Sequence, residues 1–213
     1  MTLVHRILSP QPIRSLDEYV ERRGGGGLEI ARKVEPEALI DEIEAAGLRG
    51  RGGSGFPTHQ KWRTVAENRS AFVRATVVVN GAEGEPGTFK DRTILANDPY
   101  QVIEGALIAA IAVGADQIVI GLKASFGSVV ARVREAVAEI EAAGWNEGTA
   151  FVVHEGPDHY LFGEETALLE SIDGRLPFPR VAPPFRRGVR EVLDVVNERR
   201  RPRRRDPRPH RSR

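Results

Sequence analysis

The 213-residue chain contains no cysteine. It therefore cannot form a disulfide, offer a thiolate nucleophile, or hold zinc or an iron–sulfur cluster through cysteine ligands. The chain also lacks any apolar run approaching the roughly 18 residues that span a bilayer. Its first 15 residues do not contain the apolar core of a secretory signal. We therefore expect a soluble, cytoplasmic protein with no transmembrane segment.

A net charge of +1 hides two regions of opposite sign. From Arg186 to the C-terminus, twelve arginines accompany four acidic side chains, a balance of +8. The preceding residues hold the remaining 19 basic and 26 acidic side chains, a balance of −7. A basic tract of arginine and proline is typical of disordered segments, and it can bind nucleic acid or acidic surfaces. The acidic body and the basic tail therefore need separate explanations.

Three short apolar runs have the composition of strands in a parallel sheet. They are Thr76–Val79, which we expect to be buried on both faces, Gln117–Leu122 and Thr149–His154. Helical periodicity separates them at Pro99–Gly114 and at about Ser128–Ala143. Strands and helices that alternate through short connections predict an α/β fold, with a parallel sheet flanked by helices.

The regions around this core have weaker patterns. Residues 1–15 show no periodicity and predict an extended segment, whereas Ser15–Arg23 predicts a short helix stopped by Gly24–Gly27. Glu35–Ala46 predicts a longer helix that ends at a glycine, and Gly163–Ile172 predicts one more. We expect a helical N-terminal lead-in, a ligand-binding domain and a disordered basic tail, at residues 1–34, 35–185 and 186–213.

The segment Gly47–Trp62, GLRGRGGSGFPTHQKW, begins where the longer helix ends and contains five glycines. Glycine lacks the side chain that keeps a ligand away from the backbone, and it adopts positive φ readily. Arg49, Arg51 and Lys61 add positive charge around the exposed amides, which suits an anionic group such as a nucleotide phosphate. The alternative is a mobile glycine-rich connector.

The segment Asn80–Arg92, NGAEGEPGTFKDR, directly follows the first predicted strand. Ligands of parallel α/β sheets bind beyond the carboxyl ends of the strands, and acidic side chains there commonly bind ribose hydroxyls. Glu83 and Glu85 are candidates for this role. A charged, solvated turn remains the alternative for this segment.

The segment His154–Glu165, HEGPDHYLFGEE, follows the third predicted strand and has two histidines and four acidic residues. Their spacing matches no compact metal-ligand pattern, which disfavours a metal site. Glu164 and Glu165 begin a predicted helix, where the helix dipole favours negative charge. Tyr160 and Phe162 are suited either to stacking on a planar ring or to core packing. No Ser/His/Asp or Cys/His arrangement is present, which disfavours acyl transfer.

Taken together, four motifs in the same order resemble those of a known family. They are Gly47–Trp62, Asn80–Arg92, Tyr160–Gly174 (YLFGEETALLESIDG) and Pro179–Phe185 (PRVAPPF). The family is the 51 kDa, or F, flavoprotein subunit of respiratory complex I (NADH-quinone oxidoreductase). It includes the diaphorase subunits of NAD-reducing hydrogenases and formate dehydrogenases. The resemblance extends over roughly Leu16–Phe185, which is most of the chain.

The resemblance implies a Rossmann-like domain that binds FMN and NADH and acts as an NADH:acceptor oxidoreductase. A hydride would pass from NADH to FMN, so that no side chain is required as an acid or base. Electrons would leave to a partner subunit with iron–sulfur clusters, at the cytoplasmic face of the membrane. The cofactor-binding positions it implies are Gly50, Gly52, Gly53, Gly55, Phe56, Lys61, Asn80, Glu83, Glu85, Tyr160, Gly163, Glu164, Glu165 and Phe185. In this scheme Asn80 and Glu83 contact FMN, Glu85 lies near NADH, and Phe56 and Phe185 sandwich the adenine.

The chain also departs from the family pattern. Gly81 and Ala82 stand where the complex I form has Ala-Asp, and Ala182 stands where a basic residue often precedes PPF. The match ends after Phe185, so the family's cysteine-rich iron–sulfur domain is absent from these residues. Because the basic tail begins at that point, we interpret it as a frame-altered end, which disfavours nucleic acid as a partner. The alternative to an enzyme is a truncated or degenerate nucleotide-binding module without turnover.

Overall fold

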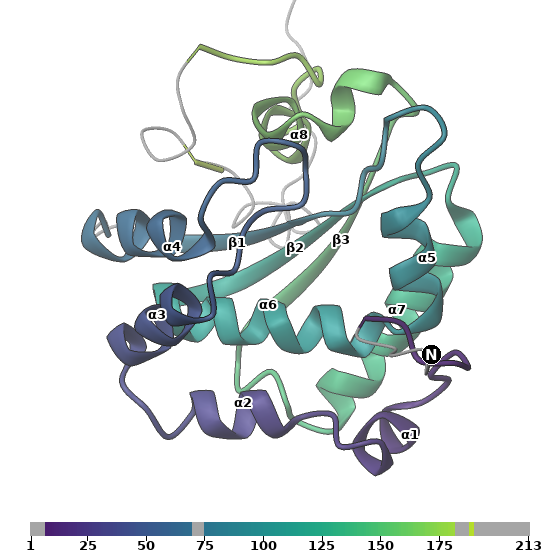
Figure 1. The fold of residues 1–213 in the computed structure, drawn as a ribbon. Coiled ribbons are helices and arrows are strands. Elements are labelled where there is room, and N and C mark those ends of the chain that lie inside the picture. Colours follow the sequence, from purple (N-terminus) through teal and green to yellow (C-terminus); the bar gives the residue numbers. More distant parts are fainter. Residues whose placement is uncertain (1–6, 70–74, 182–187, 190–213) are drawn as a thin grey trace, which may run out of the picture.

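A computed structural model describes residues 7–69, 75–181 and 188–189 of the chain (Figure 1). Its described part contains a parallel sheet of three strands in the order β1-β2-β3. The strands are β1 (Ala75–Asn80), β2 (Ala115–Lys123) and β3 (Ala150–Gly156). The predicted α/β fold with a parallel sheet and flanking helices is therefore confirmed. The strands extend beyond the predicted runs by one or two residues at every end except the start of β3, which begins one residue later than predicted.

Strand β2 is the central strand, and its position explains its composition. Ile118, Ile120 and Leu122 have no exposed surface, and neither does Val119 on the opposite face. The expectation that Thr76–Val79 is buried on both faces is wrong, because β1 lies at the edge of the described sheet and these residues are only partly buried. An apolar β-branched run in the sequence therefore does not reveal whether its strand lies at the edge or in the centre of the sheet.

One face of the sheet packs against helices α6 (Pro99–Val113) and α7 (Gly127–Ala142), with α5 (Lys90–Asn97) beside α7. Helix α6 begins at a proline, and the Asp98 carboxylate caps it by accepting a hydrogen bond from the Gln101 backbone N–H at 3.1 Å. Isoleucine, leucine and valine side chains from β2, α6 and α7 form the main core.

Helices α1 (Leu16–Glu21) and α2 (Gly26–Ala31) lie against α7 and α6, on the side away from the sheet (Figure 1). Helices α3 (Pro36–Ala45) and α4 (Thr58–Glu67) pack on each other and on α6. The glycine run was expected only to stop a helix, but its last two glycines begin α2. Helix α4 was not predicted, because the same residues were taken as the end of a glycine-rich loop.

The opposite face of the sheet is covered by helix α8 (Glu165–Ile172), which follows a short 3₁₀ turn, η1 (Tyr160–Gly163) (Figure 1). Val119 of β2 packs there with Leu168 and Leu169 of α8. Gly121 lies directly under α8, since a Cβ at Gly121 would be 2.7 Å from Leu168 Cδ1. We call this side of the sheet the α8 face.

In the part of the chain that the structure describes, no helix is long and apolar enough to cross a membrane. The disorder predicted for the basic tail concerns residues that, apart from 188 and 189, lie outside the described ranges. Ala182 and Phe185 also lie outside the described residues, so the role predicted for Phe185 stays a prediction.

Candidate functional site

The loops that follow the three parallel strands meet at the carboxyl edge of the sheet. Asn80, Gly121 and His154 pair across β1, β2 and β3, and all three lie on the α8 face. The Asn80 amide donates a hydrogen bond to the Gly163 carbonyl at 2.8 Å, and its Oδ1 accepts one from the Ala82 backbone N–H at 3.2 Å. One side chain thus holds the loop after β1 against the turn after β3.

Two glycines allow these loops to touch through their backbones. A Cβ at Gly163 would lie 2.7 Å from the Ala82 carbonyl oxygen, and one at Gly84 would lie 2.9 Å from the Tyr160 carbonyl oxygen. Both distances are shorter than real Cβ contacts, so larger residues would force the loops apart. The absence of side chains at these positions therefore sets the spacing between the two loops.

The two aromatic residues of η1 have different environments. Phe162 is fully buried and packs closely over Gly156, where a Cβ would lie 2.1 Å from the ring. Tyr160 is 58% exposed, and its hydroxyl donates a hydrogen bond to Glu85 Oε1 at 2.5 Å. This hydrogen bond to a carboxylate raises the pKa of Tyr160. Phe162 is thus a core residue, and Tyr160 is the aromatic available to a ligand.

Glu83 is held tightly within its own loop. Its side chain is 4% exposed and accepts hydrogen bonds at 3.3 Å from the Asp91 backbone N–H and from Arg92 Nε. Burial acts to raise the pKa of Glu83, but these donors outweigh it and the pKa is lowered. The Arg92 guanidinium in turn lies over the rings of Phe89 and Phe126, 5.0 and 4.9 Å from their centroids. The Glu83 carboxylate is therefore ionised and fixed in place.

The two glutamates at the start of α8 have separate roles. Glu164 caps the helix, because its carboxylate accepts hydrogen bonds from the Ala167 backbone N–H at 2.8 Å and the Thr166 hydroxyl at 2.6 Å. Burial acts to raise the pKa of Glu164, but these donors lower it overall. Glu165 instead forms an ion pair with Lys61 Nζ of α4 at 2.6 Å, with both side chains about half exposed.

The glycine-rich segment forms an exposed hairpin-like loop. Gly50 N–H donates to the Phe56 carbonyl at 2.9 Å, and Thr58 N–H donates to the Leu48 carbonyl at 3.0 Å. Gly53 and Gly55 have positive φ values of 109° and 62°, which favour glycine. A Cβ at Gly52 or Gly53 would have no neighbouring atom within 4 Å, and Phe56 is 49% exposed. The backbone of this loop is thus open to a ligand.

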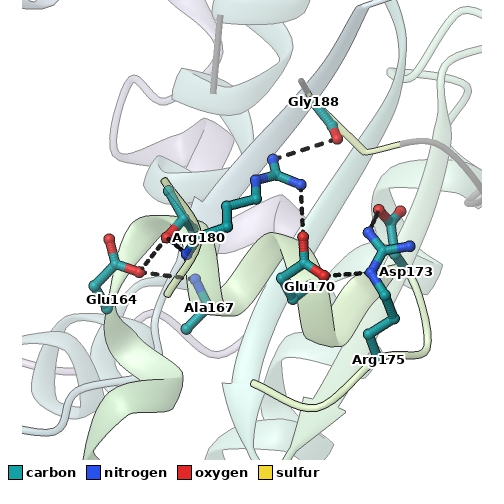
Figure 2. A network of polar contacts seen from close by, with 8 residues as sticks. Glu164, Ala167, Glu170, Asp173, Arg175, Arg180 and Gly188 are labelled. Carbon is teal, nitrogen blue, oxygen red and sulfur yellow. Dashed lines mark hydrogen bonds and ion pairs between the residues drawn. The ribbon is translucent and has the colours of Figure 1, made fainter. Parts of the chain in front are cut away.

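A network of charged residues fixes the chain that follows α8 (Figure 2). Glu170 pairs with Arg180 at 2.9 Å and also with Arg175, and these partners lower the pKa of Glu170 to about 2. The Arg180 backbone N–H donates to the Thr166 hydroxyl at 3.0 Å. Through Arg180, the described part of the fourth motif is therefore held against α8.

Lys123, the last residue of β2, was not among the predicted site residues. It is only 7% exposed, although lysine is rarely buried without a partner. Its ammonium lies beside Gly84, since a Cβ there would be 3.8 Å from Nζ. The sequence feature that could have identified Lys123 as a site residue is a charged residue directly after the apolar run QIVIGL.

The structure thus brings some predicted site residues together and leaves others apart. Contacts join the second and third motifs through Asn80 with Gly163 and through Glu85 with Tyr160, and Lys61 reaches the third motif at Glu165. We call residues 48–57 the glycine loop, which contains the predicted site residues Gly50, Gly52, Gly53, Gly55 and Phe56. Among the described residues, no hydrogen bond or ion pair joins this loop to the second or third motif.

The histidine of the third segment is not placed for metal binding. His154 Nε2 lies 2.9 Å from the Ser171 hydroxyl of α8, and burial lowers the pKa of His154. Within the described ranges, no three His, Asp or Glu side chains are grouped so that they could hold a metal ion. His154 therefore belongs to the packing between β3 and α8.

Comparisons with known proteins give a consistent result. The family model for the Nuo51 FMN-binding domain matches residues 43–198. The chain is 37% identical over 205 residues to the F subunit of NADH-quinone oxidoreductase from Aquifex aeolicus, covering 92% of this chain and 47% of the relative. It is 39% identical over 182 residues to the F subunit of the same enzyme from Escherichia coli, covering 80% of this chain and 40% of the relative.

A solved structure is also similar. The NAD⁺-reducing [NiFe]-hydrogenase in its H₂-reduced state matches with a TM-score of 0.68 and 36% identity, over 75% of this chain and 28% of the hydrogenase chain. The chain thus spans less than half the length of these three relatives.

Proposed function

Because the chain belongs to the Nuo51 FMN-binding domain family, we propose that it binds FMN and NADH and acts as an NADH:acceptor oxidoreductase domain. The observation that carries this proposal is the meeting of the matched motifs at the carboxyl edge of the parallel sheet. Asn80 with Gly163 and Glu85 with Tyr160 join segments that are 83 and 75 residues apart in the sequence. Ligands of parallel α/β folds bind at this edge.

The residues present fit a flavin nucleotide. The glycine loop offers unobstructed backbone at Gly52 and Gly53, and Tyr160 presents an exposed ring beside the carboxylate of Glu85. Lys61 and Lys123 supply positive charge for a ligand that carries a phosphate. When bound, FMN supplies the acceptor for the hydride of NADH, and the protein supplies binding and orientation.

The chain's residues then have distinct proposed roles. Asn80 presents its amide at the end of β1, and Glu83 presents an ionised carboxylate held by Arg92. Glu85 lies toward the NADH, where its hydrogen bond orients the Tyr160 ring. Gly163, Glu164 and Glu165 complete the wall formed by η1 and the start of α8.

The glycine loop forms the other proposed wall. Gly50, Gly52, Gly53 and Gly55 let the nucleotide approach the backbone, and Lys61 follows on α4. Phe56, with its half-exposed ring, would stack on the adenine, and Phe185, which lies outside the described residues, is proposed to cover the other side of the adenine. Residues 35–185 form the ligand-binding domain in this proposal.

The electron acceptor lies outside these 213 residues in this proposal. They hold no cysteine, so they cannot themselves provide cysteine ligands for an iron–sulfur cluster, and we propose that a partner subunit carries the cluster. The curated relatives are named as subunits of NADH-quinone oxidoreductase, which supports a role in an assembly. A cytoplasmic location, at the face of a membrane, is part of the same proposal.

The experiment is to purify the intact chain, titrate it with FMN, and then add NADH without oxygen. The proposal predicts a yellow protein whose flavin fluorescence changes on binding and whose flavin absorbance bleaches on adding NADH. A protein that binds FMN and NADH without bleaching would support a nucleotide-binding module without turnover. A protein that takes up no FMN would contradict the proposal.

A further inference from the structure

Lys123 is a buried cation for which no described residue provides a counter-charge. Only 7% of its surface is exposed, and its side chain makes no hydrogen bond or ion pair within the described ranges. By contrast, Lys61 pairs with Glu165, and Lys90 pairs with Asp91. Lysine is rarely this buried without a compensating contact.

The position of Lys123 directs it into the candidate site. Side chains alternate along β2, so that Ile118, Ile120 and Leu122 face α6 and α7 while Val119 and Lys123 share the α8 face. Lys123 lies two residues beyond the row that contains Asn80, past the point where β1 ends.

Gly84, in the loop that follows β1, lies beside this ammonium. A Cβ at Gly84 would be 3.8 Å from Lys123 Nζ and 2.9 Å from the Tyr160 carbonyl oxygen. The ammonium therefore lies next to the junction between the β1 loop and η1, where the proposed ligand contacts converge.

The acidic side chains around this edge are engaged elsewhere. Glu83 binds Arg92, Glu85 accepts from Tyr160, and Glu155 pairs with Arg134 of α7 at 2.5 Å. Asp158 accepts a hydrogen bond from the Ser125 hydroxyl. These carboxylates therefore do not provide a counter-charge for Lys123.

We propose that Lys123 binds an anionic group of the flavin nucleotide. This inference rests on the proposed function and deepens it. The group is either the phosphate or the pyrimidine edge of the flavin ring, since positive charge beside that edge tunes the electronics of the ring. In both cases the ammonium gains a charge-assisted hydrogen bond when the ligand arrives.

The test compares Lys123→Met with Lys33→Met, which removes the same charge from an exposed lysine in the connection between α2 and α3. The dissociation constants for FMN and for riboflavin, which lacks the phosphate, are measured by flavin fluorescence, together with the midpoint potential of bound FMN. Lys123→Met should weaken FMN binding by about 10-fold or more, and Lys33→Met should have no effect.

The two sources of negative charge give different results. If Lys123 binds the phosphate, Lys123→Met weakens FMN binding but leaves riboflavin binding unchanged. If Lys123 binds the ring, Lys123→Met weakens the binding of FMN and of riboflavin equally, and it lowers the midpoint potential of the bound flavin. Lys123→Arg, which keeps the charge, should restore most of the lost affinity in either case.

Stability separates a ligand-binding role from a structural one. Without ligand, Lys123→Met should melt at the same temperature as the wild type or higher, because the Lys123 side chain makes no hydrogen bond or ion pair in the described part of the chain that the variant would lose. If Lys123→Met does not fold, Lys123→Gln provides the uncharged comparison. A folded uncharged variant that binds both flavins as the wild type does, with an unchanged midpoint potential, overturns the inference. A wild type that binds no FMN contradicts the proposed function instead.

Discussion

Single residues at the carboxyl edge of the sheet determine how closely the loops approach one another. Gly163 and Gly84 are there because the opposing backbone occupies the space of a side chain. Asn80 adds the hydrogen bonds that hold the same loops in register. Small changes at these positions should therefore have large effects, whereas Gly52, which has open space around it and no positive φ, should tolerate them.

The first prediction compares Gly163→Ala with Gly52→Ala. At Gly163 a methyl group would meet the Ala82 carbonyl oxygen at 2.7 Å, so the variant should lose about 1–3 kcal/mol of unfolding free energy. At Gly52 no atom lies within 4 Å, and φ is not positive, so alanine should change stability by less than about 0.5 kcal/mol. Urea unfolding measures both. Equal losses would contradict the backbone contact.

The second prediction concerns Lys61. Its ion pair with Glu165 is half exposed, so Lys61→Met should cost less than about 1 kcal/mol of stability. The same variant should weaken FMN binding, because it removes positive charge between the glycine loop and α8. Urea unfolding and an FMN titration on the same preparation measure the two effects. Unchanged FMN affinity would remove Lys61 from the site.

The third prediction uses His154, whose pKa is lowered by burial against α8. A depressed histidine pKa means that the unfolded chain binds more protons, so stability is present above the unfolded pKa and is lost as pH falls below it. The wild type should therefore lose unfolding free energy between about pH 7.5 and about pH 5.5. His154→Gln, which can still bond to Ser171 but does not titrate, should lose less. An identical pH dependence in both proteins would contradict burial of the neutral imidazole.

At this scale the motifs pointed to residues that the structure brings together, but not to the contacts that these residues form. Glu83, Glu85 and Tyr160 were recognised from their motifs, but the pairing of Glu85 with Tyr160 depends on a fold that brings distant segments together. Lys123 was missed, because a lysine at the end of an apolar run is more often solvent-exposed.

At the scale of elements, the N-terminal helices form an integral layer against the core. Buried Glu104 of α6 accepts hydrogen bonds from the Tyr19 hydroxyl at 2.5 Å and from the backbone N–H groups of Gly25 and Leu28 at 2.8 and 2.9 Å. This carboxylate satisfies the free donors at the start of α2, a helix that begins without a side-chain cap of its own. It thus attaches both α1 and α2 to α6.

The fourth prediction tests this attachment. Glu104→Ala would leave three donors without an acceptor and should cost about 3 kcal/mol or more. Hydrogen exchange in α1 and α2 should become faster than in the sheet. Glu42→Ala, an exposed change on α3, is the matched control and should leave both quantities unchanged. Equal exchange throughout the Glu104→Ala variant would contradict this account.

The elements themselves were predictable where hydrophobic periodicity is strong. Helices α6 and α7 match their predicted ranges to within a residue, because each has a continuous apolar stripe against the sheet. Helix α4 was missed, since it has no fully buried residue and depends on tertiary contacts. These include ion pairs of Arg63 with Asp41 at 2.7 Å and with Glu44 at 2.9 Å. No local pattern shows such contacts.

At the scale of the whole molecule, the parallel topology brings the second and third motifs together at one edge of the sheet. The parallel sheet could be inferred from the alternation of strands and helices, and so could the edge at which the loops meet. The contacts between those loops could not, because they join residues more than 70 positions apart. The sequence therefore indicated the place of the candidate site, and the structure supplies the contacts between its loops.

The central claim is that FMN binds at this edge, between the β1 loop, η1 and the glycine loop. Hydrogen–deuterium exchange of the intact chain, with and without saturating FMN, tests it most directly. We expect slower exchange with FMN at residues 47–62, 80–92 and 160–167, and no change in α1 and α2. Slower exchange confined to other segments, in a protein that does bind FMN, would contradict it.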